Sequence, residues 1–377
     1  MSWTVPLTDV HMAEEDLQAV AECLRSGWLT MGPRTQAFEA AVAEWTGAEH
    51  AVAVSSGTAA LHLACAALEL GPGDEVILPA FTFLATAHAP RYVGARPVLA
   101  DVVSPEAPNL DVADVERRIT ERTKAVIAVH MCGYAADMTA LRSLCAERGL
   151  HLVEDAAQAL GARVCPDGAL AGTSGALGCL SFFSKKQLCL GEGGMVLTAD
   201  EALARRVRLL RSHAMTSGTW DRHRGHEDSY DVVDIGFNFR LDEPRAALGL
   251  SRLPRLTAAI EHRRAVVRAY REQLDGLDGL TLMWDEAAVE TGSHFAFPIL
   301  FASGAAREHA RAKMTARGVQ TTRYPVLHAL TEYAPFAPLG SLPRAEAAAD
   351  RHLALPLSSH TTPEQVELVV DAVRAAL

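Results

Sequence analysis

The sequence predicts an α/β protein, with a large domain built on a mostly parallel sheet of seven strands and a smaller α/β domain after it. Between residues 51 and 198, seven apolar runs occur, and helical stretches separate most of them. Nearly continuous apolar strands separated by helices are typical of a parallel sheet that helices cover on both faces. The length of 377 residues allows two domains, which we place at 1–250 and 251–377.

The apolar runs follow one another at spacings that suit strands. They are AVAVSS (51–56), DEVILPA (74–80), RPVLADV (96–102), KAVIAVHM (124–131), HLVEDAA (151–157), GCLSFF (178–183) and GGMVLT (193–198). Helices are expected to begin near Thr58 and to cover 111–121, 137–148, 201–212 and 242–275. The smaller domain is expected to contain HFAFPILF (294–301), a helix at 305–317, QTTRYP (320–325) and a helix at 363–376.

Composition and charge argue against several classes of protein. Hydrophobic residues make up 49% of the chain and charged residues 21%, as in an ordinary globular protein. The formal charge of −11 argues against nucleic acid or an anionic membrane as a partner. The chain lacks an apolar run of about 18 residues, a CxxC pair among its seven cysteines, and a signal-peptide pattern. We therefore expect a cytoplasmic protein, and no metal ion in its site.

The motif SSGTAAL, from Ser55 to Leu61, joins a strand to a helix. Gly57 lets the backbone approach a ligand closely, and the free N–H groups of a first helical turn suit a phosphate. The same residues also make an ordinary helix N-cap, and the motif alone favours that plainer interpretation.

Asp155, in EDAAQAL, stands at the carboxyl end of a strand that is predicted to be buried. Ligands of open α/β sheets bind beyond that end of the strands. A carboxylate there either caps the following helix or faces a ligand. In the second case it could face the protonated ring nitrogen of pyridoxal phosphate and keep that ring an electron sink.

The segment SFFSKKQLCLGEGG, from Ser181 to Gly194, decides between these interpretations. Only four of the 35 basic residues are lysines, yet Lys185 and Lys186 stand here side by side between a strand and a Gly-rich turn. A lysine that is positioned and partly desolvated forms a Schiff base readily, because its amine has a lowered pKa. Two solvated loop lysines become improbable once all three motifs occur in this order.

The chain resembles the DegT/DnrJ/StrS-type sugar aminotransferases, a branch of the fold-type I pyridoxal-phosphate enzymes. The resemblance runs nearly end to end. The blocks that carry it are SGWLTMGP (26–33), SSGTAAL (55–61), GPGDEVILPAFTFLAT (71–86), HMCGYAADM (130–138), EDAAQALGA (154–162), SFFSKKQLCLGEGG (181–194), GFNFRLDEPRAALGL (236–250) and ALPLSSHTTPEQV (354–366).

The resemblance implies how the cofactor, pyridoxal 5′-phosphate, is held. The block S-F-x-x-x-K places the Schiff base on Lys186, with Lys185 a neighbour. Gly57, Thr58 and Ser181 are expected to bind the phosphate. Asn238, in GFNFR, is expected to reach the phosphate of the other subunit, so the active sites of a homodimer would be shared.

The resemblance also implies contacts with the cofactor ring. Phe83, in AFTFLAT, is expected to stack on the ring, Asp155 to pair with its nitrogen, and Gln158 to lie near its hydroxyl group. Gln187 stands where many members have asparagine, which keeps the amide chemistry. Some relatives replace the lysine with histidine and become deoxygenating enzymes; the lysine here favours transamination.

Substrate contacts are expected in two places. The polar segment 213–239 carries a basic run that is either a solvated surface or a clamp for an anionic substrate group: Arg222, His223, Arg224 and His226. Tyr324 and His328, in RYPVLHAL, match a family segment that lines the sugar pocket.

The function that the resemblance implies is transfer of an amino group from L-glutamate or L-glutamine to a keto-sugar, nucleotide-linked or not, or to a keto-cyclitol. Antibiotic or polysaccharide sugar synthesis is the usual setting of the family. Two alternatives stay open: a pyridoxal-phosphate dehydratase or lyase, and a regulatory protein that binds the cofactor without turnover. The combination of Lys186, Asp155 and Phe83 favours catalysis.

Overall fold

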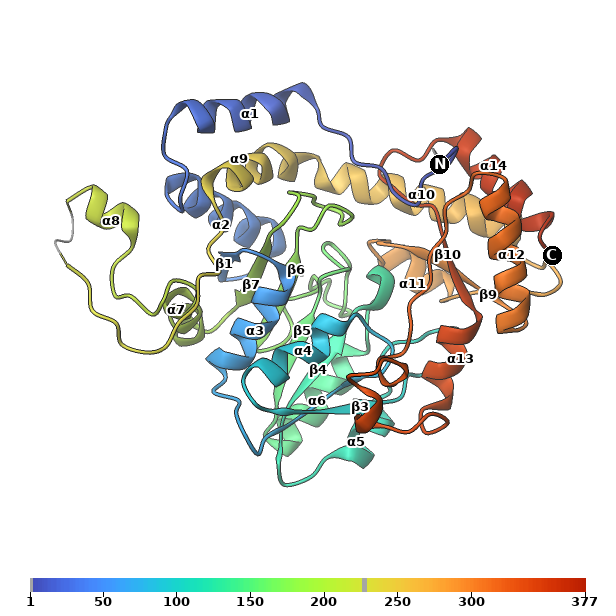
Figure 1. Ribbon diagram of the computed structural model, residues 1–377, viewed down its shortest axis with the longest axis horizontal. Helices are drawn as coiled ribbons and strands as arrows, with labels where there is room; N and C mark the ends of the chain where they lie inside the picture. Colours follow the sequence, from blue (N-terminus) through green and yellow to red (C-terminus); the bar gives the residue numbers. More distant parts are fainter. Residues whose placement is uncertain (1–2, 226–228) are drawn as a thin grey trace.

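The larger of two sheets organises the molecule. The computed structural model describes residues 3–225 and 229–377. Seven strands form the larger sheet in the order β1-β7-β6-β5-β4-β2-β3 (Figure 1). In that order the strands are His50–Val54, Gly194–Thr198, Leu177–Ser181, His151–Asp155, Thr123–Val129, Glu75–Pro79 and Arg96–Ala100.

The strand directions confirm the expected sheet. β2 runs parallel to β3 and β4, β4 to β5, and β5 to β6. β7 alone among the seven runs in the opposite direction, antiparallel to both of its neighbours, β1 and β6. The segment between β6 and β7 contains no helix, and parallel neighbours need a long crossover. The chain therefore returns directly and reverses its direction.

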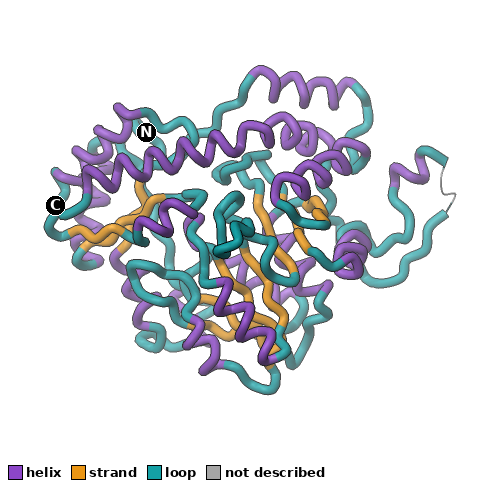
Figure 2. Tube along the Cα trace, turned by 180° about the vertical axis from the view of Figure 1, so that it is seen from behind, coloured by secondary structure: helices purple, strands orange, loops and turns teal. Residues whose placement is uncertain are grey.

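Helices cover both faces of this sheet (Figure 2). Side chains of β1 alternate between two apolar clusters, with Val52 and Val54 in one and Ala51 and Ala53 in the other. The first cluster includes residues of α3 (Gly57–Ala67), α4 (Leu84–Tyr92) and α7 (Glu201–Leu210). The second includes residues of α2 (Pro33–Thr46), α5 (Val112–Arg118), α6 (Met138–Arg148) and α9 (Glu243–Arg252).

A second, antiparallel sheet lies in the C-terminal part of the chain, in the order β10-β9-β8. Its strands are His352–Leu355, Phe297–Phe301 and Leu280–Leu282. The helices of this part are α10 (Leu256–Leu274), α11 (Glu286–Thr291), α12 (Gly304–Ala316), α13 (Pro343–Arg351) and α14 (Pro363–Arg374). The expected segment 320–325 forms only an isolated bridge, between Thr322 and Ala354.

The prediction of a single helix at 242–275 is wrong in one respect. A 3₁₀ turn at Leu253–Arg255 separates α9 from α10. Pro254 lies in that turn, and proline interrupts a helix because it lacks the backbone N–H. The domain division at 250/251 stays a prediction, and it falls inside α9.

The N-terminal segment lies against the C-terminal part of the chain (Figure 1). The backbone N–H of Thr4 donates to the carbonyl of Gly318 at 2.9 Å, and Val5 forms a parallel bridge with Val319. The N–H of Leu357 donates to the carbonyl of Leu7 at 2.9 Å. The first helix, α1 (Glu14–Arg25), then packs on α9.

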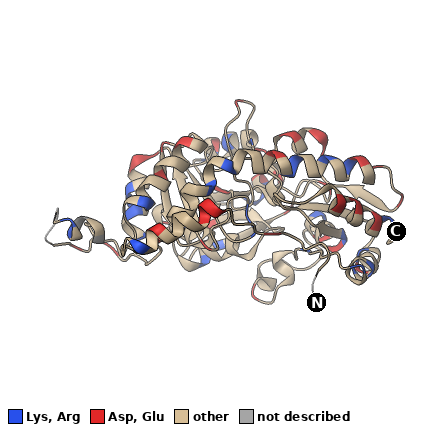
Figure 3. Cartoon of the chain, turned by 90° about the horizontal axis from the view of Figure 1, so that it is seen from above, with Lys and Arg blue, Asp and Glu red and all other residues tan. Residues whose placement is uncertain are grey.

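The helices carry both signs of charge. Figure 3 shows acidic and basic side chains interspersed along them. Within residues 3–225 and 229–377, we find no helix that is both long and apolar enough to cross a membrane.

Candidate active site

A cavity of about 330 Å³ opens where the parallel strands β5 and β6 end. Its lining comes from the N-terminal segment, the loops of the large sheet and the C-terminal part of the chain. Eight of the residues expected in the site line it: Gly57, Thr58, Phe83, Asp155, Gln158, Ser181, Lys186 and Tyr324.

One end of the cavity is the start of α3. Ser56 caps this helix, because its hydroxyl oxygen accepts the N–H of Ala59 at 3.0 Å. The N–H groups of Gly57 and Thr58 precede the first bond of the helix and are free to bind an anion. A Cβ on residue 57 would lie 2.8 Å from the Cβ of Ser181, so the helix can approach β6 this closely only with glycine there.

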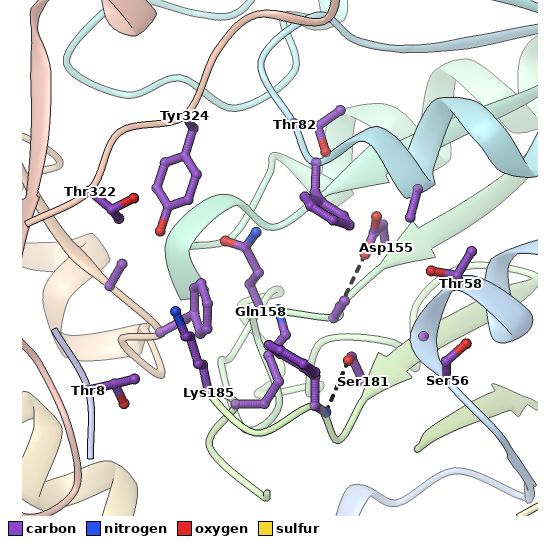
Figure 4. Close-up of a pocket in the computed structure, with 18 of the residues that line it drawn as sticks. Thr8, Ser56, Thr58, Thr82, Asp155, Gln158, Ser181, Lys185, Thr322 and Tyr324 are labelled. Atoms are coloured by element: carbon purple, nitrogen blue, oxygen red, sulfur yellow. Dashed lines mark hydrogen bonds between the residues drawn. The ribbon is translucent and has the colours of Figure 1, made fainter. Parts of the chain in front are cut away.

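Asp155 presents a buried carboxylate to the cavity (Figure 4). One oxygen accepts the hydroxyl of Thr86 at 2.7 Å, and the other accepts the N–H of Ala157 at 3.2 Å. Burial raises its pKa, while the Thr86 hydrogen bond and the charge of Lys186 act in the opposite direction. In the described part of the chain this carboxylate has no ion-pair partner. A buried carboxylate of this kind fits a ligand that brings its own cation.

Lys186 follows a tight turn in which its N–H donates to the carbonyl of Phe183 at 2.8 Å. Its ammonium nitrogen lies 4.1 Å from the centre of the Phe295 ring. Burial lowers the pKa of Lys186 to about 8, although the negative charge of Asp155 opposes this shift. A larger fraction of this amine is therefore neutral at neutral pH than for an ordinary lysine, and the neutral amine is the nucleophile.

Two amide side chains, those of Gln158 and Gln187, hydrogen-bond the segments around the cavity to one another. Gln158 Oε1 accepts the N–H of Cys132 at 2.8 Å, which leaves its NH₂ group free to donate. Gln187 Nε2 donates to the carbonyl of Gln158 at 2.7 Å and to the hydroxyl of Ser293 at 2.9 Å. Gln187 therefore has a structural role here: it ties the lysine loop to its neighbours.

Two of the expected lining residues are aromatic. Phe83 precedes α4 and remains 59% exposed, so this side of the cavity is open in the single chain. Tyr324 stacks on His352, with ring centres 5.5 Å apart and planes 7° from parallel. In Figure 4 the hydroxyl of Tyr324 points into the cavity.

Four expected residues do not line this cavity. His328 is buried, and its Nε2 lies 2.9 Å from Glu346 Oε1. Asn238 is exposed, and its backbone forms a bridge with Ser212. The other two belong to the segment around α8 (Thr219–His223), which projects from the body of the molecule (Figure 1): Arg222 and Arg224.

Both arginines have partners within the projecting segment. Arg222 donates to the carbonyl of Ser217 at 2.6 Å, and its guanidinium lies 4.8 Å from the centre of the Tyr230 ring. The guanidinium of Arg224 lies 5.8 Å from the ring centre of Trp220. His226, the last residue of the expected basic run, lies outside the described residues.

Comparison with known proteins places the chain in a family. Residues 10–374 match the DegT/DnrJ/EryC1/StrS aminotransferase family. The chain belongs to this family. It is therefore a transaminase of fold type I, which confirms the expected family, fold and enzyme class.

Relatives of this aminotransferase act on nucleotide-linked sugars. A dTDP-3-amino-3,4,6-trideoxy-alpha-D-glucose transaminase of Streptomyces venezuelae is 40% identical, over 98% of this chain and 95% of the relative. A UDP-N-acetyl-3-dehydro-alpha-D-glucosamine 3-aminotransferase of Acidithiobacillus ferrooxidans is 38% identical, over 99% of this chain and 98% of the relative. The crystal structure of S. venezuelae DesV in complex with a ketimine intermediate superposes with a TM-score of 0.90 and 38% identity, covering 100% of this chain and 98% of DesV.

The sequence did not reveal every residue of the aminotransferase's cavity. Thr8, Thr322 and Phe295 line it as well, although they come from distant segments. Thr82 supports Asp155 indirectly, because its hydroxyl lies 2.9 Å from that of Thr86. The two threonines are four residues apart at the start of α4, a spacing that brings side chains together on a helix, but this helix was not predicted from the sequence.

Proposed function

We propose that this aminotransferase binds pyridoxal phosphate in the cavity and transfers an amino group from L-glutamate or L-glutamine to a keto-sugar or keto-cyclitol. One observation carries the proposal: a single cavity combines an anion site, a buried carboxylate without a cation, and an amine of lowered pKa. The anion site is the start of α3, the carboxylate belongs to Asp155 and the amine to Lys186. These three groups match the phosphate, the protonated ring nitrogen and the reactive carbon of the cofactor.

The phosphate would be held by one end of the cavity. The N–H groups of Gly57 and Thr58 face it from the start of α3, and the hydroxyls of Thr58 and Ser181 add further donors. A doubly charged phosphate at this position is stabilised by the helix N-terminus.

The ring would be held by the remaining groups. Asp155 would accept a hydrogen bond from the ring nitrogen, and that new positive charge would hold the carboxylate ionised despite its burial. Phe83 would cover one face of the ring, and the free NH₂ group of Gln158 would donate to its hydroxyl oxygen.

Lys186 has two roles in this proposal. The bound cofactor supplies an electron-withdrawing ring that acidifies the bonds to the donor's α-carbon. With the cofactor bound, Lys186 would hold it covalently through Nζ. After the amino donor displaces Lys186, its neutral Nζ would take the proton from the α-carbon of the donor in the first half of the reaction. In the second half, it would give a proton to the acceptor carbon that receives the amino group.

The acceptor is inferred from the relatives. Those compared above bear the names of transaminases for dTDP- and UDP-linked sugars. Since these matches cover nearly the whole chain, we propose a nucleotide-linked keto-sugar as the acceptor and a keto-cyclitol as the alternative. A cytoplasmic location stays a prediction.

We further propose a homodimer with shared active sites. Phe83 lines the cavity and yet is 59% exposed, which leaves one side for a partner to cover. The projecting segment carries apolar side chains that are unusually exposed for a monomer: Tyr230, Val232, Val233 and Ile235. Asn238 is exposed beside this segment, and a partner's phosphate site would give its amide a ligand.

Half-reaction spectroscopy tests the function. Addition of L-glutamate or L-glutamine to the holoenzyme should bleach the long-wavelength absorption band of the bound cofactor and release one equivalent of the 2-oxo acid. Borohydride should fix the cofactor to Lys186 in the resting enzyme. Bleaching without a 2-oxo acid would favour the lyase alternative, and no response to either donor would contradict the proposal.

A further inference from the structure

The cavity contains few charged side chains. Among the described residues that line it there is no arginine and no histidine, and the basic residues are Lys185 and Lys186. The acidic residues are Asp155 and Glu192. Because the proposed function assigns Lys186 to the cofactor, Lys185 is the remaining cation that this lining offers to a substrate.

The position of Lys185 is fixed by its backbone. Ser184 and Lys185 form the centre of the turn that the N–H of Lys186 closes on the carbonyl of Phe183. The N–H and the hydroxyl of Ser184 both donate to the carbonyl of Gly191, at 3.1 Å and 3.2 Å. The turn is therefore hydrogen-bonded to the Gly-rich segment that precedes β7. As a result, the Cα atom of Lys185 has little freedom to move.

The side chain of Lys185 extends into the cavity (Figure 4). In that view it lies with Thr8 and Tyr324 on one side, while Thr58 and Asp155 lie on the other. Lys185 is exposed, and it has no hydrogen-bond or ion-pair partner in the described part of the chain. Its ammonium group is therefore available to a ligand without first breaking an internal contact.

We infer that Lys185 binds an anionic group of a substrate, at the side of the cavity away from the start of α3. The inference rests on the proposed function and adds to it a residue that selects the substrate. Both substrates of that function carry such a group: the amino donor has carboxylates, and a nucleotide-linked acceptor has a diphosphate. An ammonium suits either, because it is a compact charge with three rotatable donors.

The negative net charge of the protein increases the need for a local cation, such as the Lys185 ammonium, to bind an anionic substrate. The chain has a formal charge of −11, so an anionic substrate is repelled on average. Within a partly enclosed site, a hydrogen bond to a charged group is stronger than one between neutral groups. Removal of the Lys185 charge should therefore weaken binding of that substrate by roughly 10- to 100-fold.

The test uses holoenzyme of the wild type, Lys185→Gln, Lys185→Arg and, as a matched control, Lys124→Gln. Lys124 is exposed at the beginning of β4 and does not line the cavity. In the first arm, the concentration dependence of cofactor bleaching gives the apparent affinity for L-glutamate. In the second arm, dTDP and UDP are tested as competitors of that reaction, which gives the affinity for a nucleoside diphosphate.

Each outcome has one meaning. Weaker binding of L-glutamate in Lys185→Gln, with recovery in Lys185→Arg and no change in Lys124→Gln, assigns Lys185 to the donor carboxylate. Weaker competition by dTDP or UDP with the same pattern assigns it to the diphosphate. Wild-type affinities in both arms overturn the inference while the proposed function stands. If wild-type holoenzyme does not respond to any amino donor, the proposed function itself fails.

Discussion

Replacement of Lys186 by methionine should stabilise the cofactor-free protein, and it should do so only below a defined pH. Burial lowers the pKa of this amine from its ordinary 10.5 to about 8. At about 1.4 kcal/mol per pH unit, this difference corresponds to at most about 3.5 kcal/mol. Methionine has a similar length and no charge, so the folded variant avoids this penalty.

The pH dependence follows from the protons bound in each state. Between about pH 8 and 10.5, the unfolded chain keeps the Lys186 proton and the folded protein has lost it, so wild-type stability rises with pH through this window. Below about pH 8 both states are protonated, and the folded wild type bears the full penalty. At pH 7 the free energy of unfolding of Lys186→Met should therefore exceed that of wild type by up to about 3.5 kcal/mol. This advantage should shrink steadily towards pH 10.5.

Urea unfolding at several pH values, followed by the fluorescence of the five tryptophans, measures the free energy of unfolding of wild type and of Lys186→Met. Any change in packing caused by methionine adds an offset that does not vary with pH. Lys185→Met is the matched control, because that side chain is exposed. A stability difference for Lys186→Met that stays constant from pH 7 to 10.5 would refute the reasoning.

Three further predictions concern the cofactor. Asp155→Asn should reduce kcat by several orders of magnitude with a modest loss of cofactor affinity, because an amide cannot stabilise a protonated ring nitrogen; near-normal kcat at full cofactor occupancy would contradict this role. Gly57→Ala should weaken cofactor binding by about 10- to 100-fold in a titration, since the new Cβ would lie 2.8 Å from the Cβ of Ser181. Mixing the inactive variants Lys186→Ala and Asn238→Asp should restore activity, because one site of each heterodimer carries neither change. If heterodimers form and stay inactive, Asn238 acts within its own chain.

The sequence predicted those parts of the site that follow from local patterns. Gly57 follows β1, Asp155 ends β5 and Ser181 ends β6. Such positions can be placed in advance, because strands that run in the same direction in one sheet end at the same edge. The apolar run GGMVLT likewise predicted the strand β7, although its reversed direction came only with the structure.

The remaining parts depend on contacts between distant segments. The hydroxyl of Thr86 bonds Asp155, 69 residues further along, and no local pattern signals that contact. His328 shows the opposite situation. A histidine that pairs with a partly buried glutamate cannot be distinguished in sequence from one that faces a substrate. The strands β8 and β10 have three and four residues, too few for a periodic pattern to stand out.

The pairing of the N-terminal segment has a consequence for the newly made chain. The N–H of Leu7 donates to Gln320 Oε1 across 313 residues of sequence, and Leu7 and Thr8 both line the cavity. At a synthesis rate of about 5–20 residues per second, Gln320 is made roughly 15 to 60 s after Leu7. The large sheet can form during this interval, but the wall that Leu7 and Thr8 contribute cannot. A nascent chain on the ribosome could therefore hold a cofactor only in an open cavity until Gln320 has been made.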